Sequence, residues 1–226
     1  MIKAVIFDMF ETLITHYESP LYFGEHMAED MGIPEEKFRE IWDLSGDDRT
    51  VGKISLEEIV RQILEANQLF SEELFSKVVD KRKSVKKDCF RHIHKEIVPM
   101  LEALKKEGIK LGLITNCFSE EVEVIRDSVL FPYFDVPLLS YEEGMQKPDK
   151  RIFINCVNRL EVQPEECLYV GDGGSLELET ASELGMQPLQ AVWYLKEGSR
   201  QRLRRKAGFI QAENPLDVLE YCRIEM

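Results

Sequence analysis

The sequence has no long apolar run, no paired cysteines and no surplus of positive charge. Because no run approaches the roughly 20 apolar residues that span a bilayer, a membrane-embedded chain is not expected. The five cysteines are odd in number and form no CxxC pair, which argues against a disulfide framework and a zinc site. The net charge of −13 disfavours binding to nucleic acid and to anionic membranes. Most of the cysteines are therefore expected to be small core residues: Cys89, Cys117, Cys156, Cys167 and Cys222.

The length of 226 residues is enough for one domain that carries a subdomain. The apolar stretch next to Met1 is only about five residues long and runs into Asp8, so we expect a buried strand there and no secretion signal. A cytoplasmic location follows as an expectation. The basic run at 200–206 is the one counter-signal to the acidic composition. It has no interleaved aromatic residues, which favours a solvated surface segment over a nucleic-acid site.

Strand-like apolar runs alternate with helical patterns along most of the chain. Segments with apolar residues at helical spacing separate these runs. Examples are 97–104, which precedes Gly108, and 152–160, which follows Asp149. Alternating strands and helices imply parallel pairing with right-handed crossovers. We therefore predict an α/β fold with a Rossmann-like open parallel sheet. The predicted strands are 4–7, 111–114, 136–139, 167–170 and 188–192.

One long interval breaks this alternation. Residues 15–90 contain no strand-like run but several amphipathic patterns, including 38–42 and 56–64. We predict that this interval is an inserted α-helical cap domain, and that residues 1–14 and 91–226 form the core domain. Ligands of open α/β sheets bind beyond the carboxyl ends of the strands, which is where the insert begins.

The first strand ends in a carboxylate and a Thr-Leu turn, in the segment 5–13. This segment resembles the opening motif of the haloacid dehalogenase superfamily, an apolar strand followed by Asp-x-Asp-Gly-Thr. Asp8 and Thr12 agree with the motif, whereas Phe10 replaces its second aspartate and Glu11 its glycine. The resemblance implies a hydrolase with a Rossmann-like core and a helical cap of the C1 type.

Three further segments match the motifs of the superfamily in the right order. The segment 112–116 is a strand that ends in Thr115 and Asn116, and 144–149 contains the Lys-Pro-Asp signature with Lys147. The segment 168–177 contains Gly-Asp at Asp172 and a second acid, Glu177, five residues later. Since all four segments follow apolar strands or precede a helix, they are more specific together than any is alone. The resemblance therefore spans the whole chain.

The resemblance implies chemistry on a small phosphorylated metabolite. Asp8 would attack phosphorus and form an aspartyl-phosphate, which splits hydrolysis into two easier displacements. Thr115, Asn116 and Lys147 would bind the phosphoryl oxygens, with Thr115 and Lys147 also counted as catalytic. Magnesium would be held by Asp8, the main-chain carbonyl of Phe10 and Asp172. Glu177 would either hold a metal-bound water or pair with Lys147, or would be only an acid at a helix N-terminus.

Phe10 is the main departure from the pattern. In phosphatases of the superfamily the aspartate at this place protonates the leaving oxygen, a role usually worth about 10²- to 10⁴-fold in rate. A phenyl ring cannot do this, so we expect substrates whose leaving group needs little protonation, or another acid. His16 is a candidate for that acid, against the alternative of a solvent-facing loop histidine.

Two other functions stay open. In a 2-haloacid dehalogenase Asp8 would attack carbon and halide would leave unprotonated, which is compatible with Phe10, although Asp172 in its glycine-rich loop favours a metal. A catalytically weakened phosphometabolite-binding or protein-interaction module is the second alternative.

In the insert, Arg49 and Lys53 flank Gly52 between two predicted helices. We predict that they bind the substrate, at a carboxylate or second phosphate, with solvation of ordinary loop charges as the alternative. The identity of the substrate cannot be predicted from the sequence, and a monomer and a homodimer are both compatible with it.

Overall fold

The computed structural model describes residues 1–196, 201 and 204–224. Its core is one six-stranded sheet in the order β3-β2-β1-β4-β5-β6, in which every neighbouring pair is parallel. The strands are β1 (Ala4–Phe7), β2 (Lys110–Thr115), β3 (Val136–Leu139), β4 (Cys167–Gly171), β5 (Gln187–Ala191) and β6 (Ile210–Ala212). The predicted α/β fold with an open parallel sheet is confirmed.

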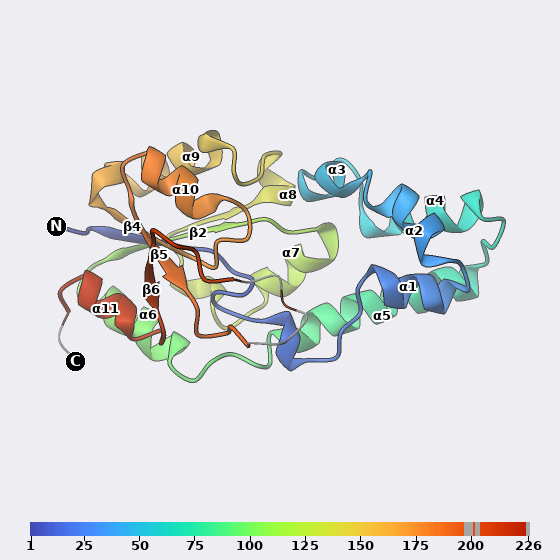
Figure 1. The fold of residues 1–226 in the computed structure, drawn as a ribbon, viewed down its shortest axis with the longest axis horizontal. Coiled ribbons are helices and arrows are strands. Elements are labelled where there is room, and N and C mark those ends of the chain that lie inside the picture. Colours follow the sequence, from blue (N-terminus) through green and yellow to red (C-terminus); the bar gives the residue numbers. More distant parts are fainter. Residues whose placement is uncertain (197–200, 202–203, 225–226) are drawn as a thin grey trace.

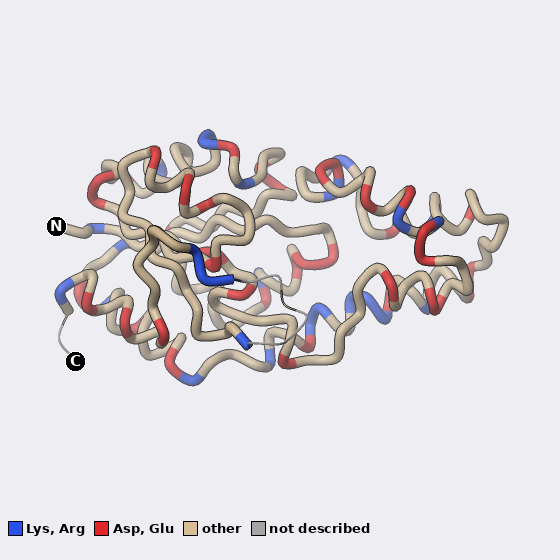
Figure 2. The backbone as a smooth tube through the Cα atoms, in the orientation of Figure 1, with Lys and Arg blue, Asp and Glu red and all other residues tan. Residues whose placement is uncertain are grey.

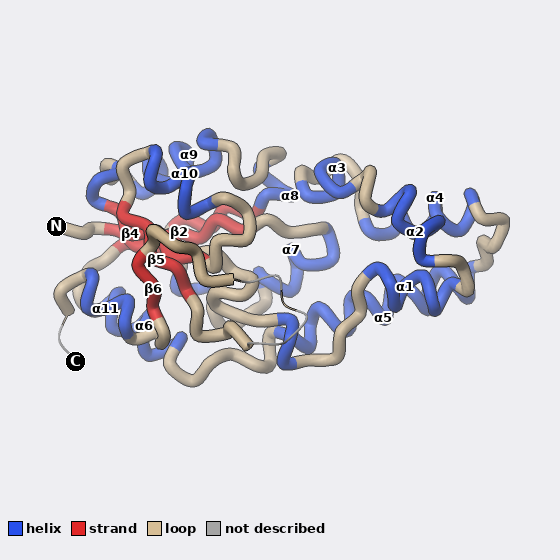
Figure 3. The backbone as a smooth tube through the Cα atoms, viewed as in Figure 1, coloured by secondary structure: helices blue, strands red, loops and turns tan. Residues whose placement is uncertain are grey.

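Helices cover both faces of this sheet, and the helical part of the chain extends to one side of it (Figure 1; Figure 3). On one face lie α9 (Lys150–Leu160) and α10 (Glu177–Glu183), and on the other lie α6 (Ile97–Lys106) and α11 (Asp217–Tyr221). The short α8 (Ser140–Glu143) and the helix α7 (Ser119–Arg126) follow β3 and β2 respectively. Short 3-10 helices occur at His16–Glu18, Phe131–Tyr133 and Pro164–Glu166.

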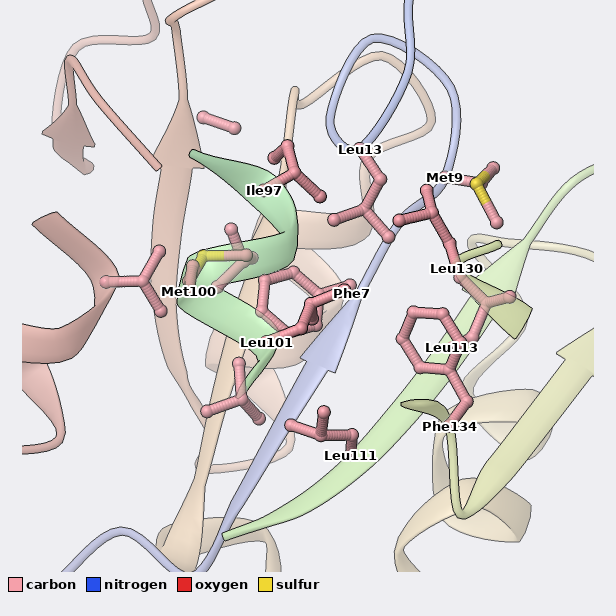
Figure 4. Close-up of a cluster of buried hydrophobic side chains, with 14 of the residues drawn as sticks. Phe7, Met9, Leu13, Ile97, Met100, Leu101, Leu111, Leu113, Leu130 and Phe134 are labelled. Carbon is pink, nitrogen blue, oxygen red and sulfur yellow. The ribbon is translucent and has the colours of Figure 1, made fainter. Parts of the chain in front are cut away.

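Strand β1 lies in the middle of the sheet, between β2 and β4. All four of its residues are apolar and fully buried, because helices cover both faces of the sheet. Phe7 packs with Leu101 and Leu113 in the core cluster on the side of α6, shown in Figure 4. Ile6 points to the opposite cluster, on the side of α9. Burial on both faces fixes the register of β1 and therefore the position of the residue that follows it, Asp8.

The interval between β1 and α6 is helical, as predicted. It contains α1 (Gly24–Met31), α2 (Glu35–Trp42), α3 (Gly46–Thr50), α4 (Leu56–Ala66) and α5 (Glu72–Cys89). We call these five helices the helical insert. Fourteen buried apolar residues between Tyr22 and Val79 form a cluster of their own, separate from the two clusters beside the sheet.

Both edges of the helical insert are attached to the core. At the α3 edge, the Oγ of Ser140 donates a hydrogen bond of 2.8 Å to the carbonyl oxygen of Thr50. The Oγ of Ser119 accepts one of 2.8 Å from the backbone N–H of Leu56. At the other edge, α5 packs on α7. Within the insert, basic residues gather on α5, whose sequence has six basic and four acidic residues (Figure 2).

Several sequence predictions are settled by these elements. The five predicted strands are present within one or two residues, whereas β6 was not predicted because its three residues carry too short a pattern. The cysteines are all free, and Cys222 alone among them is only partly buried. None of the helices in the described ranges is both long and apolar enough to cross a membrane.

The basic run at 200–206 lies partly outside the described residues. Within the described part, Arg205 pairs with Glu213 and Lys206 pairs with Glu179. The charges of these two residues are therefore matched by acidic neighbours, in line with a surface segment.

Candidate active site

Asp8, Thr115 and Asp172 come together because they follow or end three adjacent strands. In the register of the sheet, Phe7 lies opposite Leu113 of β2 and Val170 of β4. The residues at the carboxyl ends of these strands therefore lie at one edge of the sheet. Asp8 is 6% exposed, and its Oδ1 accepts a hydrogen bond of 2.7 Å from the backbone N–H of Met9.

Lys147 joins this group from the loop between α8 and α9. Its Nζ lies 2.6 Å from the Oδ1 of Asp8, and both side chains are buried. The side chain of Asn116 holds the loop in place: its Nδ2 donates to the carbonyl oxygen of Lys147 at 3.0 Å, and its Oδ1 accepts from the N–H of Lys147 at 2.8 Å. Asn116, predicted to bind substrate, therefore positions the backbone of Lys147 in the structure.

Glu177 organises the glycine-rich loop after β4. Its two carboxylate oxygens accept hydrogen bonds of 2.6 Å from the backbone N–H groups of Gly173 and Ser175. It is also the first residue of α10, where an acid is favourable. The structure therefore agrees with the prediction of a helix N-terminal acid, whereas the ammonium of Lys147 pairs with Asp8. A Cβ at position 171 would lie 3.0 Å from the Oε1 of Glu177, which explains the glycine there.

The carboxylates of Asp8, Asp172 and Glu177 form one compact group. Each offers an oxygen within 4.8 Å of the others. Fully ionised, they carry three negative charges against the single positive charge of Lys147, and burial makes such an imbalance costly.

The pKa values of these groups reflect that imbalance. Burial, with Asp8 and Glu177 as neighbours, raises the pKa of Asp172 to about 8. Burial also raises the pKa of Asp8, although Lys147 opposes this effect. For Glu177 burial acts in the same direction, but Lys147 and the N–H groups outweigh it, so its pKa is lowered. Without a further cation, the raised pKa of Asp172 favours a protonated Asp172 carboxyl at neutral pH.

This donor set fits a hard divalent cation. Oxygen ligands from carboxylates are those that magnesium prefers, and the cation would replace the proton of Asp172. Asp8 and Asp172 have oxygens available for it, whereas both oxygens of Glu177 already accept backbone hydrogen bonds. The main-chain carbonyl of Phe10 stays a prediction.

A cavity of about 740 Å³ lies between the helical insert and the strand ends. From the core it is lined by Phe10, Asn116 and Ser175, which adjoin the carboxylate group. From the insert it is lined by charged and aromatic residues of α1, α2 and α5, among them Arg39, Trp42, Arg82 and Lys86. A molecule in this cavity is placed between the carboxylate group and the insert.

The place of the missing acid is filled by an aromatic stack. The ring of Phe10 lies over that of His16, and the Nε2 of His16 is 3.4 Å from the Nζ of Lys86. Burial, together with the positive charges of Lys86 and Arg82, lowers the pKa of His16 well below its ordinary value. His16 is therefore neutral at physiological pH, which argues against the prediction that it acts as the acid.

Of the two residues predicted to flank Gly52 in a loop, Lys53 lies in the turn between α3 and α4, whereas Arg49 does not. Arg49 lies within α3 and is buried, because its side chain packs between Trp42 and Phe118. Lys53 is exposed and its Nζ lies 2.8 Å from the Oδ1 of Asp48. Neither residue is among those that line the cavity. The prediction of a loop around Arg49 is wrong, because a short helix continues to Thr50.

Four buried charged residues at the same boundary were missed. Arg82 and Lys86, one helical turn apart on α5, pair with Glu120 and Glu121 at the start of α7. The i, i+4 spacing of the two cations and the adjacent acids are visible in the sequence. Nothing local indicates that they are buried against each other, because Arg82 and Glu120, for example, are 38 residues apart along the chain.

Comparison with known proteins gives the family. The model of the haloacid dehalogenase-like hydrolases matches residues 2–185. The phosphorylated carbohydrates phosphatase of Thermotoga maritima is 30% identical over 98% of both chains. The glyceraldehyde 3-phosphate phosphatase of Methanopyrus kandleri is 34% identical over 92 residues, which is only 40% of either chain.

Solved structures share the fold over nearly the whole length. A phosphatase of the same superfamily from Thermococcus onnurineus aligns over 99% of both chains with a TM-score of 0.66 and 19% identity. A 2-haloacid dehalogenase from Pseudomonas syringae aligns over 99% of both chains with a TM-score of 0.68 and 24% identity. At these identities the likeness extends to the fold, and it does not separate the two activities.

Proposed function

Because this chain belongs to the haloacid dehalogenase-like hydrolases, we propose that it is a magnesium-dependent phosphatase that acts on a small phosphorylated metabolite. In this proposal the carboxylate of Asp8 attacks phosphorus as the bond from phosphorus to the leaving oxygen breaks, and water then cleaves the aspartyl-phosphate to give inorganic phosphate and free Asp8. The observation that carries the proposal is the compact group of Asp8, Asp172 and Glu177 beside the ammonium of Lys147, because this excess of carboxylates fits a divalent cation and an incoming phosphate.

The other residues have separate tasks. Lys147 holds the carboxylate of Asp8 by its ion pair and is placed to bind a phosphoryl oxygen. Thr115, at the end of β2, offers a hydroxyl to the same oxygens, and Asn116 keeps Lys147 in place. Magnesium, held by Asp8, Asp172 and the carbonyl of Phe10, would supply charge neutralisation between the nucleophile and the phosphate.

We propose further that residues 15–90 act as a cap over this site. The cavity between the insert and the strand ends is lined from both sides, so the substrate would contact the insert while it reacts. Aromatic and mixed charged residues of the lining suit a phosphorylated carbohydrate or a similar polar metabolite, as the name of the Thermotoga relative suggests.

A phosphatase assay with magnesium and with chelator tests this function. We expect phosphate release from a panel of metabolite phosphates that needs magnesium and falls by several orders of magnitude in Asp8→Asn. Lys3→Gln, far from the site and paired with Glu166 on the surface, is the matched control. Turnover that persists in Asp8→Asn would mean that Asp8 is not the nucleophile.

Assays on the same protein preparation distinguish the 2-haloacid dehalogenase alternative from a phosphatase. A dehalogenase would release halide from 2-chloropropionate in the presence of chelator and would lose little when Asp172 is replaced by Asn. We expect neither result, because the group around Asp172 has an excess of negative charge that a metal-free reaction leaves unbalanced.

A further inference from the structure

A second group of buried charges lies between the helical insert and the core. Its cations outnumber its carboxylates, whereas carboxylates outnumber the one ammonium in the group around Asp8. All five of its members are less than a tenth exposed. They are three cations and two carboxylates, Arg49, Arg82, Lys86, Glu120 and Glu121. One positive charge in this group therefore has no partner within it.

The two cations of α5 are matched. The Nε of Arg82 donates to the Oε1 of Glu120 at 2.9 Å, and the Nζ of Lys86 lies 2.5 Å from the Oε1 of Glu121. Each pair is neutral as a whole, wherever its proton lies. The surplus charge is therefore that of Arg49.

Arg49 contacts only uncharged groups. Its Nε donates to the Oγ of Ser45 and its Nη2 to the carbonyl oxygen of Trp42, both at 3.0 Å. Its Nη1 is buried and has no hydrogen-bond partner among the described residues. Burial lowers the pKa of Arg49 to about 10, so the guanidinium is still charged at neutral pH. The buried acids nearest to Arg49, Glu120 and Glu121, already pair with Arg82 and Lys86, so its burial is costly unless a further anion completes its surroundings.

The guanidinium of Arg49 lies next to the cavity wall. Its central carbon is 3.6 Å from the centre of the Trp42 ring and 4.6 Å from that of Phe118. Both rings line the cavity, as do Arg82 and Lys86. The surplus charge is thus separated from the cavity by little more than the thickness of an aromatic ring, with low-dielectric surroundings that transmit its field.

Arg39, which lines the cavity one helical turn before Trp42 on α2, does not share this property. Arg39, on α2, pairs with Glu35 at 2.6 Å and lies 3.5 Å from a carboxylate oxygen of Glu25 and 3.7 Å from one of Asp43. Three acids surround Arg39, so it adds no unmatched positive charge to the cavity. The unmatched cation is therefore Arg49, behind Trp42 and Phe118.

We propose that the cavity binds substrates that carry a second anionic group, a carboxylate or a second phosphate, which lies on the side of Arg49, Arg82 and Lys86. This proposal rests on the proposed function, since the first anionic group is the phosphate held at Asp8 and Lys147. Arg49 would determine specificity by supplying the unmatched charge. The carboxylates around Asp8 would then hold the divalent cation and the phosphate. The charged group around Arg49 would bind the second anionic group of the substrate.

Binding to the inactive Asp8→Asn protein with magnesium, measured by calorimetry, tests this without turnover. The ligands are glycerol 3-phosphate and 3-phosphoglycerate, which differ by a carboxylate, and fructose 6-phosphate and fructose 1,6-bisphosphate, which differ by a phosphate. In at least one pair we expect the ligand with the second anionic group to bind roughly 10- to 100-fold more tightly than the ligand with a single phosphate, as for a hydrogen bond to a charged group. Which pair shows the preference identifies the anionic group.

Arg49→Met in the same background should bring that ratio close to one, and Arg49→Lys should retain part of it. Lys53→Met, on the exposed side of the same segment, is the matched control and should leave the ratio unchanged. Equal affinities within both pairs in the protein with Arg49 intact would overturn the proposal, even if Arg49→Met does not fold. A ratio that survives in folded Arg49→Met would also overturn it.

Failure of the proposed function gives a different result. In that case the active protein would show no turnover that depends on Asp8, whereas the binding ratio would still be measurable. A preference for the ligand with the second anionic group, together with absent turnover, would support the binding site and contradict the phosphatase activity.

Discussion

The ring of Phe10 stacks on the imidazole of His16, with ring centres 4.7 Å apart and planes 20° from parallel. Phe90, the residue that follows α5, packs in a T-shaped arrangement with Phe10, with ring centres 6.3 Å apart. The position beside Asp8 that carries an aspartate in phosphatases of the superfamily is therefore occupied by an aromatic stack. Because His16 is held neutral there, neither ring supplies a proton to a leaving group.

Phe10→Asp should restore the missing acid. We expect it to raise turnover of alkyl phosphates, whose leaving groups are poor, by up to about 10²-fold, the lower end of what a general acid contributes. Acetyl phosphate, whose leaving group needs little protonation, should change much less. The measurement is kcat/KM on both substrates, with Phe10→Leu as the control that removes the ring without adding an acid. Equal effects on the two substrates in a folded variant would contradict the assignment.

The stability of the metal-free protein should depend on pH through Asp172. Its pKa is raised to about 8 in the folded protein, from an ordinary value of 3.8, so the folded state holds a proton that the unfolded state has lost. Between about pH 4 and 8 the free energy of unfolding should therefore fall as pH rises, by at most about 1.4 kcal/mol per unit for one proton.

Urea denaturation with chelator at a series of pH values measures this slope, and Asp172→Asn should remove its largest part. Magnesium competes with the same proton, so its apparent affinity should rise with pH up to about 8 and then level off. An affinity that is constant from pH 6 to 8 would show that Asp172 is not a ligand.

Gly52 should be irreplaceable at the edge where the insert joins the core. Its φ is +77°, and a Cβ there would lie 2.1 Å from the carbonyl oxygen of Tyr141 on α8. Gly52→Ala must therefore move the insert away from the core, which should lower both the melting temperature and kcat/KM.

Gly32 is the matched control for this change. Its φ is +70°, but a Cβ there would meet no atom within 4 Å. Gly32→Ala should cost about 1 to 2 kcal/mol, the price of a left-handed residue that is not glycine, and leave kcat/KM unchanged. If the two variants lose the same stability and activity, contact with Tyr141 is not what requires Gly52.

The strands and the carboxylate group at their ends were predictable because their signals are local. Each of β1, β2 and β4 is an apolar run followed directly by a reactive residue, namely Asp8, the terminal Thr115 or Asp172. Parallel pairing brings the carboxyl ends of adjacent strands to one edge, so spacing along the chain was enough to predict that these residues meet. Lys147 followed from its place in a motif before α9.

The charges of the insert were not predictable in the same way. The sequence determined that residues 15–90 are helical, through their amphipathic periodicity, and that Arg49 is a cation near Gly52. Only the tertiary structure decided that Arg49 is buried between Trp42 and Phe118 while Lys53 is exposed. Burial and pairing of charges depend on contacts between α5 and α7, and between α3 and the core, which periodicity within one helix does not specify.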